Sequence, residues 1–184
     1  NNNFNRMVFQ QKVTAKHFGA GDKMLTIMPV FHGFGLCSSV HMPLSYGITT
    51  ILIPKFDSKE FYKLMSKYKP NHVFGVPKLW KALMNDKKIQ GMDLSFMKYI
   101  VSGGENMKDG LEEEINKFFE QHNCYYKLKK GYGSTEAVAG TTLSDDNCNE
   151  IGSIGIPLIC NDFKIVKPET EEEQKRFEAA LRRK

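Results

Sequence analysis

One short stretch of this 184-residue chain brings together the residue types that bind phosphate and metal. It reads Gly131-Tyr132-Gly133-Ser134-Thr135-Glu136 and follows an aromatic, strand-like segment at residues 125–128. The glycines allow a sharp turn and a close approach to a ligand. The hydroxyls of Ser134 and Thr135 can donate hydrogen bonds to phosphate oxygens, and the carboxylate of Glu136 is a hard oxygen ligand that suits magnesium. The alternative is an ordinary glycine-rich loop with a helix starting at Ser134 or Thr135, and spacing alone does not separate the two.

The segments around this stretch predict how it is positioned. Short apolar or β-branched runs alternate with segments of helical apolar spacing, in steps of about 25 residues. This alternation predicts an α/β fold built from βαβ units, with a parallel or mixed sheet and helices on both faces. We expect strands at residues 24–28, 48–53, 71–75, 98–102 and 125–128, and helices within 1–21, 34–46, 57–68, 77–84 and 111–119.

Three segments of unusual composition begin where an expected strand ends, at Pro29, Ser102 and Leu128. In open parallel sheets, ligands bind beyond the carboxyl ends of the strands. We therefore expect these segments to share one edge of the sheet and to form a single site there.

Four stretches carry a resemblance. Gly131-Tyr132-Gly133-Ser134-Thr135-Glu136-Ala137 resembles the core motif of the adenylate-forming, or AMP-binding, enzymes: acyl-CoA synthetases, aryl-CoA ligases, luciferases and peptide-synthetase adenylation domains. Met28-Pro29-Val30-Phe31-His32-Gly33-Phe34-Gly35-Leu36 resembles their acyl-pocket motif, and Val101-Ser102-Gly103-Gly104-Glu105 the turn that borders the adenine. Gly152-Ser153-Ile154-Gly155-Ile156-Pro157 with Lys164-Ile165-Val166-Lys167-Pro168-Glu169-Thr170 resembles the segment that closes the large domain. The likeness looks greatest to bacterial fatty-acyl-CoA synthetases, the long-chain-fatty-acid–CoA ligases.

The resemblance implies a fragment of an ATP-dependent acid–thiol ligase. In such enzymes a carboxylate attacks the α-phosphate of ATP to give an acyl-adenylate and pyrophosphate. A thiol, usually that of coenzyme A, then takes the acyl group. Mg²⁺ and positioned hydrogen bonds stabilise the charge on the transferring phosphorus. ATP, Mg²⁺ and coenzyme A are therefore the expected cofactors.

Carried over by position, the resemblance also assigns roles to the nucleotide-binding residues. Thr135 would bond the α-phosphate, and Glu136 would be the metal ligand. Tyr132 would pack against the adenine. The other residues expected to line the nucleotide are Gly103, Gly104, Glu105, Gly131, Gly133 and Ser134. The carboxylate of Glu105 could equally be a solvated turn residue.

On the acid side, His32 would lie near the reacting carboxylate and act with Thr135 and Glu136 as a catalytic residue, while Gly131 and Gly133 would leave room for the acyl chain. A histidine at a strand end can also be structurally inert, and only the surrounding motif favours the functional role. The other four histidines lack such a setting and are expected to be structural or solvated.

The acyl-pocket motif favours one class of substrate. Relatives that activate α-amino acids usually carry an aspartate shortly after the aromatic residue, whereas this chain reads Phe31-His32-Gly33-Phe34. A buried ammonium group without a counter-charge is costly. We therefore expect an uncharged, fatty acid, with either coenzyme A or a carrier protein as the thiol.

The resemblance covers only part of the family's pattern. Residues 1–173 match the central part of the large AMP-binding domain, whereas 174–184 read as an atypical helical tail of unknown origin. The phosphate loop with its lysine, the ribose-binding aspartate, the hinge and the C-terminal domain have no counterpart here. We expect the fragment alone to be inactive and to self-associate. A non-catalytic nucleotide- or acyl-adenylate-binding module, an adenylation domain that loads a carrier protein, and an interaction protein that docks through its tail remain as alternatives.

Composition excludes several other classes. The hydrophobic content of 41% and charged content of 26% are those of a globular protein. No run approaches the roughly 20 apolar residues of a membrane span, so a cytoplasmic protein is expected. The net charge of +5 is modest, and nucleic-acid binding would need a focused basic face. Lys127, Lys129 and Lys130 beside Tyr125 and Tyr126 could form a surface for stacking and phosphate contacts, but we expect these lysines to be solvated. The four cysteines show no metal or disulfide spacing, and Cys37 is expected to be buried.

Overall fold

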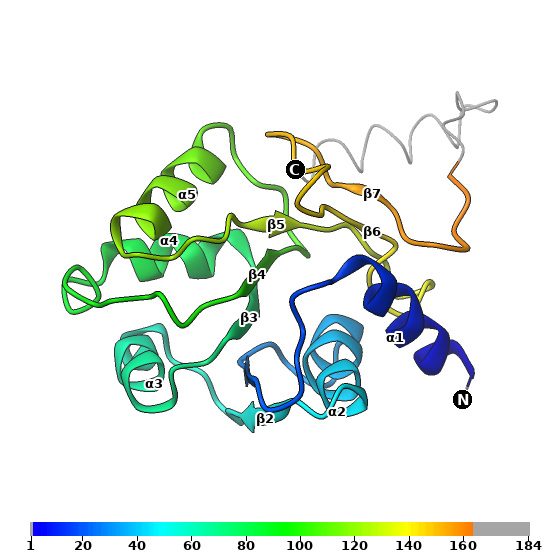
Figure 1. Ribbon diagram of the computed structural model, residues 1–184, viewed down its shortest axis with the longest axis horizontal. Helices are drawn as coiled ribbons and strands as arrows, with labels where there is room; N and C mark the ends of the chain where they lie inside the picture. Colours follow the sequence, from blue (N-terminus) through cyan, green and yellow to red (C-terminus); the bar gives the residue numbers. More distant parts are fainter. Residues whose placement is uncertain (1, 164–184) are drawn as a thin grey trace.

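A five-stranded parallel sheet forms the centre of the computed structural model, which describes residues 2–163 (Figure 1). The strand order is β2-β1-β3-β4-β5, and every neighbouring pair is parallel. The strands are β1 (Lys23–Thr26), β2 (Thr49–Leu52), β3 (His72–Gly75), β4 (Tyr99–Ser102) and β5 (Lys129–Lys130). The expected α/β fold with a parallel sheet is thus confirmed.

Helices cover both faces of this sheet (Figure 1). On one face lie α3 (Phe61–Tyr68), α4 (Pro77–Asn85) and α5 (Leu111–Gln121), preceded by the short 3₁₀ turn η2 (Ser58–Glu60). On the other face lie α1 (Asn2–Thr14), the π-helical η1 (Phe34–His41) and α2 (Met42–Ser45). Each expected helix within the described residues is therefore present.

Two apolar cores result, because adjacent residues of a strand point to opposite faces. In β4, Ile100 packs with α3, α4 and α5, whereas Tyr99 and Val101 pack with α1 and η1. Strands buried on both faces need continuous rather than alternating apolar sequence. This requirement explains why the runs at 24–28, 71–75 and 98–102 could be recognised as strands.

The connections change direction between β1 and β3. The chain passes from β1 through η1 and α2 to β2, and then returns through α3 to β3 on the other side of β1. In such sheets a crevice opens beyond the carboxyl ends of the two strands where the order reverses. The segments after β1 and β3 therefore flank the place where a ligand is expected.

The fifth strand differs from the prediction. Residues 125–128 are not in the sheet, and Tyr125 is 86% exposed; the strand consists of Lys129 and Lys130 instead. Aromatic content indicated the earlier segment, but the polar pair that follows it makes the hydrogen bonds to β4. The strand end therefore lies at Lys130, immediately before Gly131.

The segment after β5 turns back on itself. Gly133 and Gly140 form an antiparallel bridge, and Ser134 N donates to the carbonyl of Ala139 at 3.0 Å. Residues 134–139 form this turn, so the alternative of a helix starting at Ser134 or Thr135 is wrong. A small antiparallel pair, β6 (Thr142–Leu143) with β7 (Ile156–Pro157), follows.

Two expectations lie outside the described residues: the second half of the closing motif, at 164–170, and the helical tail at 174–184. Within 2–163, every helix is too short or too polar to span a bilayer.

Candidate active site

An apolar cavity of about 190 Å³ lies between the sheet, α1 and η1. Its walls come from the segments that follow β1, β4 and β5, together with side chains of the strands themselves. Aromatic rings supply much of the lining, from Phe18, Phe34, Phe74 and Tyr99. The expected meeting of the motifs at one sheet edge is therefore observed, and the hollow they form suits an apolar group.

A wider cleft, of about 880 Å³, opens on the other side of the same segments, and we call it the polar cleft because lysines and carboxylates are among its lining residues. Three stretches of chain form most of its walls: one within residues 102–113, a second at 130–133 and a third at 151–154, with Lys78 of α4 beside them. Lysine and carboxylate side chains are part of these walls, whereas the apolar cavity is lined by neither. The cleft is large enough for a nucleotide, since small-molecule sites commonly measure about 300–1,000 Å³.

The two hollows share a wall. Gly104, Gly131, Tyr132 and Gly133 line both the cavity and the cleft. A molecule with an apolar body and a polar nucleotide could therefore place one part in each hollow, with its junction at this wall. An acyl-adenylate has this composition.

Glycine at position 133 has a structural cause that is independent of any ligand. A Cβ there would lie 1.9 Å from the carbonyl oxygen of Ala139, on the opposite arm of the turn. At position 131 a Cβ would lie 2.9 Å from the carbonyl of Thr142. The close backbone packing of the turn thus requires small residues, whether or not an acyl chain passes nearby.

His32 lies at the rim of the apolar cavity, just before η1. Its Nδ1 accepts the backbone N–H of Phe34 at 3.1 Å. A neutral imidazole with an acceptor at Nδ1 carries its proton on Nε2. The side chain can therefore donate a hydrogen bond from Nε2 to a carboxylate oxygen.

The residues of the turn divide between the cavity and solvent. Ser134 and Thr135 line the apolar cavity, whereas Glu136 is exposed and is part of neither hollow. Hydrogen bonds from its own backbone amide and from the Ser134 side chain lower the pKa of Glu136. A carboxylate that stays ionised and open to solvent fits a metal ligand, since magnesium in nucleotide sites takes one or two carboxylates with phosphates and water. Among residues 2–163, no cluster of three or more His, Cys, Asp or Glu could hold a metal by itself.

Glu105 lines the polar cleft next to Gly104. Its carboxylate lies 3.6 Å from the ammonium group of Lys78, and both side chains are exposed. The structure thus brings the residues named from sequence to the cavity or the cleft, with Glu136 as the exception.

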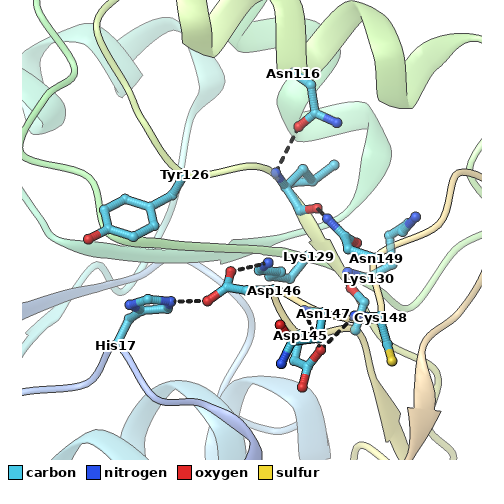
Figure 2. Close-up of polar contacts among 12 residues, drawn as sticks. His17, Asn116, Tyr126, Lys129, Lys130, Asp145, Asp146, Asn147, Cys148 and Asn149 are labelled. Carbon is cyan, nitrogen blue, oxygen red and sulfur yellow. Dashed lines mark hydrogen bonds and ion pairs between the residues drawn. The ribbon is translucent and has the colours of Figure 1, made fainter.

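Sequence reasoning missed the groups that anchor the strand before the motif. Figure 2 shows Asp146 between His17 and Lys129; the Asp146 oxygens lie 2.5 Å from His17 Nε2 and 2.5 Å from Lys129 Nζ. On the opposite face of β5, Lys130 Nζ donates to Glu112 Oε1 at 2.5 Å. Lys129 is 3% exposed and Lys130 is 5% exposed. The expectation that these two lysines are solvated is therefore wrong.

Asparagine side chains hold the chain that leads into β5. Asn116 accepts the backbone N–H of Leu128 at 2.8 Å, and Asn149 donates to the Leu128 carbonyl at 3.0 Å (Figure 2). Adjacent lysines in a strand point to opposite faces. Because helices cover both faces of this sheet, each lysine there needs a partner of opposite charge, and the Lys129-Lys130 pair could have indicated this. Nothing in the sequence indicated that the partners would be Glu112 and Asp146.

Comparison with known proteins identifies the family of the chain. Residues 1–179 match the family model described as AMP-binding enzyme. Over 152 residues, the chain is 35% identical to a long-chain-fatty-acid–CoA ligase of Bacillus subtilis. The aligned region covers 82% of this chain and 26% of the ligase. A long-chain-fatty-acid–CoA ligase of Haemophilus influenzae is 32% identical over 170 residues, with coverage of 87% and 29%.

A solved structure shows the same fold. The anthranilate CoA ligase AuaEII, crystallised in complex with anthranoyl-AMP, superposes with a TM-score of 0.79 at 19% identity, over 91% of this chain and 32% of that enzyme. The chain thus spans between a quarter and a third of the length of these relatives. With a family model that matches nearly its whole length, the chain belongs to the AMP-binding enzyme family.

Proposed function

We propose that this chain forms the acid-binding cavity and one side of the adenylate-binding cleft of an ATP-dependent acid–thiol ligase. The observation that carries the proposal is the wall of Gly104 and residues 131–133, which separates an apolar cavity from a polar cleft and lines both. The names of the relatives, which are CoA ligases, support the same reaction class. Residues 1–173 would be the central part of the large domain.

In the first step a carboxylate oxygen of the acid attacks the α-phosphorus of ATP, the bond to the bridging oxygen breaks, and pyrophosphate leaves with the electron pair. His32 orients the carboxylate from Nε2, and the hydroxyl of Thr135 donates to an α-phosphate oxygen. Glu136 would hold a magnesium ion, which would supply positive charge near the phosphoryl oxygens. In the second step a thiol sulfur, which we assign to coenzyme A, attacks the acyl carbon and AMP leaves.

The acid is an uncharged one with an apolar body, and a fatty acid is the first candidate. The Phe31-His32-Gly33-Phe34 sequence places no carboxylate where an α-ammonium group would need one, and the cavity lining is largely aromatic and aliphatic.

The size of the cavity favours a second candidate, a monocyclic aryl acid. A dry protein cavity of about 150 Å³ accommodates benzene, and the cavity here measures about 190 Å³ between aromatic rings. Binding of adenylate analogues with benzoyl, octanoyl and palmitoyl groups ranks the two candidates. Tightest binding of the palmitoyl compound supports a fatty acid, and tightest binding of the benzoyl compound supports an aryl acid.

The decisive test is calorimetric binding of a non-hydrolysable acyl-adenylate analogue to this chain. We expect binding by the wild type and at least a tenfold loss in Thr135→Ala, because a hydrogen bond to a charged group is worth about 1.5–3 kcal/mol. Glu136→Ala removes the proposed magnesium ligand and should also weaken binding when Mg²⁺ is present. Thr49→Ala on β2 and Glu120→Ala on α5 are matched controls, since both residues are exposed and distant from the cavity and the cleft. A folded wild-type chain that does not bind the analogue would contradict the proposal.

A further inference from the structure

Lys130 and Glu112 form a buried ion pair in the lining of the polar cleft, and the proposed reaction gives neither residue a role. Lys130 Nζ lies 2.5 Å from Glu112 Oε1, and the two side chains are 6% and 4% exposed. Lys130 closes β5, and Glu112 lies in the first turn of α5, so the pair joins a strand to a helix that is 18 residues away in sequence. Both residues line the cleft.

The same two side chains also hold the third wall of the cleft. Lys130 Nζ donates a second hydrogen bond, to the carbonyl of Glu150 at 2.5 Å. The other oxygen of Glu112, Oε2, accepts the backbone N–H of Gly152 at 3.2 Å. All three walls, within 102–113, at 130–133 and at 151–154, are therefore linked through one ion pair.

This link reaches the residue expected to face the adenine. The segment held by Glu112 continues to Ile154, whose carbonyl accepts from Thr142 Oγ1 at 2.6 Å. The same Thr142 oxygen accepts the backbone N–H of Tyr132 at 3.0 Å. The position of residues 150–154 and the position of Tyr132 are thus set by one connected network of hydrogen bonds.

A buried ion pair is a weak source of net stability, because the cost of removing both charges from water offsets their attraction. Its geometry is nevertheless demanding, since each group must keep its partners to remain buried. An apolar pair could fill the same volume but would make no hydrogen bonds to the carbonyl of Glu150 or the amide of Gly152. The arrangement therefore contributes position more than stability.

We propose that Glu112 and Lys130 are positioning residues for nucleotide binding: they fix residues 150–154 against β5 and α5 and so set the width of the cleft that receives the adenylate. This inference rests on the proposed function for the identity of the ligand. The link itself is a property of the chain and can be measured without any ligand.

The first experiment follows backbone hydrogen exchange in the 184-residue chain. Loss of the charged acceptor in Glu112→Gln should raise exchange at residues 151–155 about tenfold, the lower end of the effect of a charge-assisted hydrogen bond. Glu114→Gln is the control, because Glu114 lies two residues after Glu112 on α5, is exposed and lines neither hollow. Unchanged exchange at 151–155 in Glu112→Gln would overturn the proposal.

The second experiment measures affinity for AMP, which tests the cleft, and for octanoate, which tests the cavity. Glu112→Gln should bind AMP about tenfold more weakly, whereas octanoate affinity should stay within twofold of wild type, because neither Glu112 nor Lys130 lines the cavity. Equal loss for both ligands would indicate a general loss of structure and would count against positioning. If the wild type binds no AMP, the proposed function fails, and the exchange experiment still decides whether the link exists.

A double variant separates position from stability. Glu112→Leu combined with Lys130→Met replaces the pair by apolar groups, which commonly preserves or raises the free energy of unfolding. We expect the double variant to unfold near the wild-type urea midpoint while its exchange at 151–155 stays fast and its AMP affinity stays low. Recovery of affinity together with stability would show that the pair is merely structural and would overturn the proposal.

Discussion

The carbonyl oxygen of Val138 occupies the space that a Cβ atom at Gly33 would need, 1.9 Å from the position of that atom. Gly33 belongs to the segment after β1, and Val138 belongs to the turn after β5. The segment that carries His32 and the turn that carries Thr135 are therefore in direct backbone contact. Side chains that would face the acid and the phosphate are held in one unit by this contact.

Replacement of Gly33 by alanine tests this contact. The backbone at Gly33 is right-handed helical, with φ of −53°, so alanine is conformationally acceptable and would by itself gain about 0.4–1 kcal/mol. The overlap with the Val138 carbonyl should outweigh that gain, because overpacking costs about 1–3 kcal/mol. We expect Gly33→Ala to lower the free energy of unfolding in urea by about 1–2 kcal/mol. Gly91→Ala is the control: a Cβ there meets no atom within 4 Å, and the change should be neutral or stabilising.

Val138 itself is held in an unfavourable conformation. Its φ of 77° lies in the left-handed region, which costs a residue with a Cβ about 1–2 kcal/mol and suits a β-branched residue least. Val138→Gly should relieve this strain while losing about 1 kcal/mol of burial from a half-buried side chain. We expect the midpoint of thermal unfolding to change little and the amide exchange of residues 134–139 to rise.

The same exchange measurement supplies the comparison for Val138. Asn123 also has a positive φ, of 62°, but lies in the turn after α5. Asn123→Gly should leave exchange at residues 134–139 unchanged. If amide exchange at residues 134–139 is the same in Val138→Gly as in wild type, the conformation of residue 138 does not control the mobility of the turn.

Local sequence patterns were sufficient for most of the scaffold. The runs around Leu25, Val73 and Ile100 are buried on both faces of the sheet, so composition alone distinguished them as strands. The meeting of the motifs at one edge followed from the parallel topology. These features depend on residues that are close in sequence and on the general geometry of βαβ units.

The fifth strand and its anchors could not be predicted in the same way. Tyr125 belongs to a favourable strand composition but is exposed, whereas Lys129 and Lys130 are buried because Asp146 and Glu112 pair with them. Lys129 and Lys130 are buried in the sheet because of partners 17 and 18 residues away in sequence. No local sequence pattern indicates these partners. The π-helical geometry of η1 is likewise a local departure that apolar spacing did not indicate.

The pairing of Lys129 leads to an asymmetric mutational effect. The Lys129 side chain is 4% exposed, whereas that of Asp146 is 50% exposed. Asp146→Asn leaves a buried ammonium group without its counter-charge, and we expect a loss of about 2 kcal/mol after allowance for the partial exposure of the pair. Lys129→Met removes the buried charge instead and should cost less. Urea unfolding at pH 7 measures both variants, with the exposed Asp162→Asn as control. A larger loss in Lys129→Met than in Asp146→Asn would contradict this interpretation.

A buried histidine in strand β3 predicts how the free energy of unfolding depends on pH. His72 is fully buried, with Nε2 3.0 Å from Asp22 Oδ2, and Lys98 Nζ lies 2.7 Å from the other oxygen of that carboxylate. Burial lowers the pKa of His72 to about 4, against the opposing effect of its hydrogen bond to Asp22. Burial raises the pKa of Asp22, but the hydrogen bonds from Lys98 and His72 outweigh it and leave that pKa lowered.

The depressed pKa of His72 determines the sign of the effect. An unfolded histidine titrates near 6.5, so between that value and about 4 the unfolded chain binds a proton that the folded chain does not. The stabilisation is therefore complete above pH 7 and is lost as the pH falls. From pH 7 to pH 4.5 we expect the free energy of unfolding in urea to fall by about 2–3 kcal/mol through this residue. His72→Gln, which keeps a donor for Asp22 but does not titrate, should flatten this dependence. The same fall in wild type and His72→Gln would assign the pH dependence to other groups.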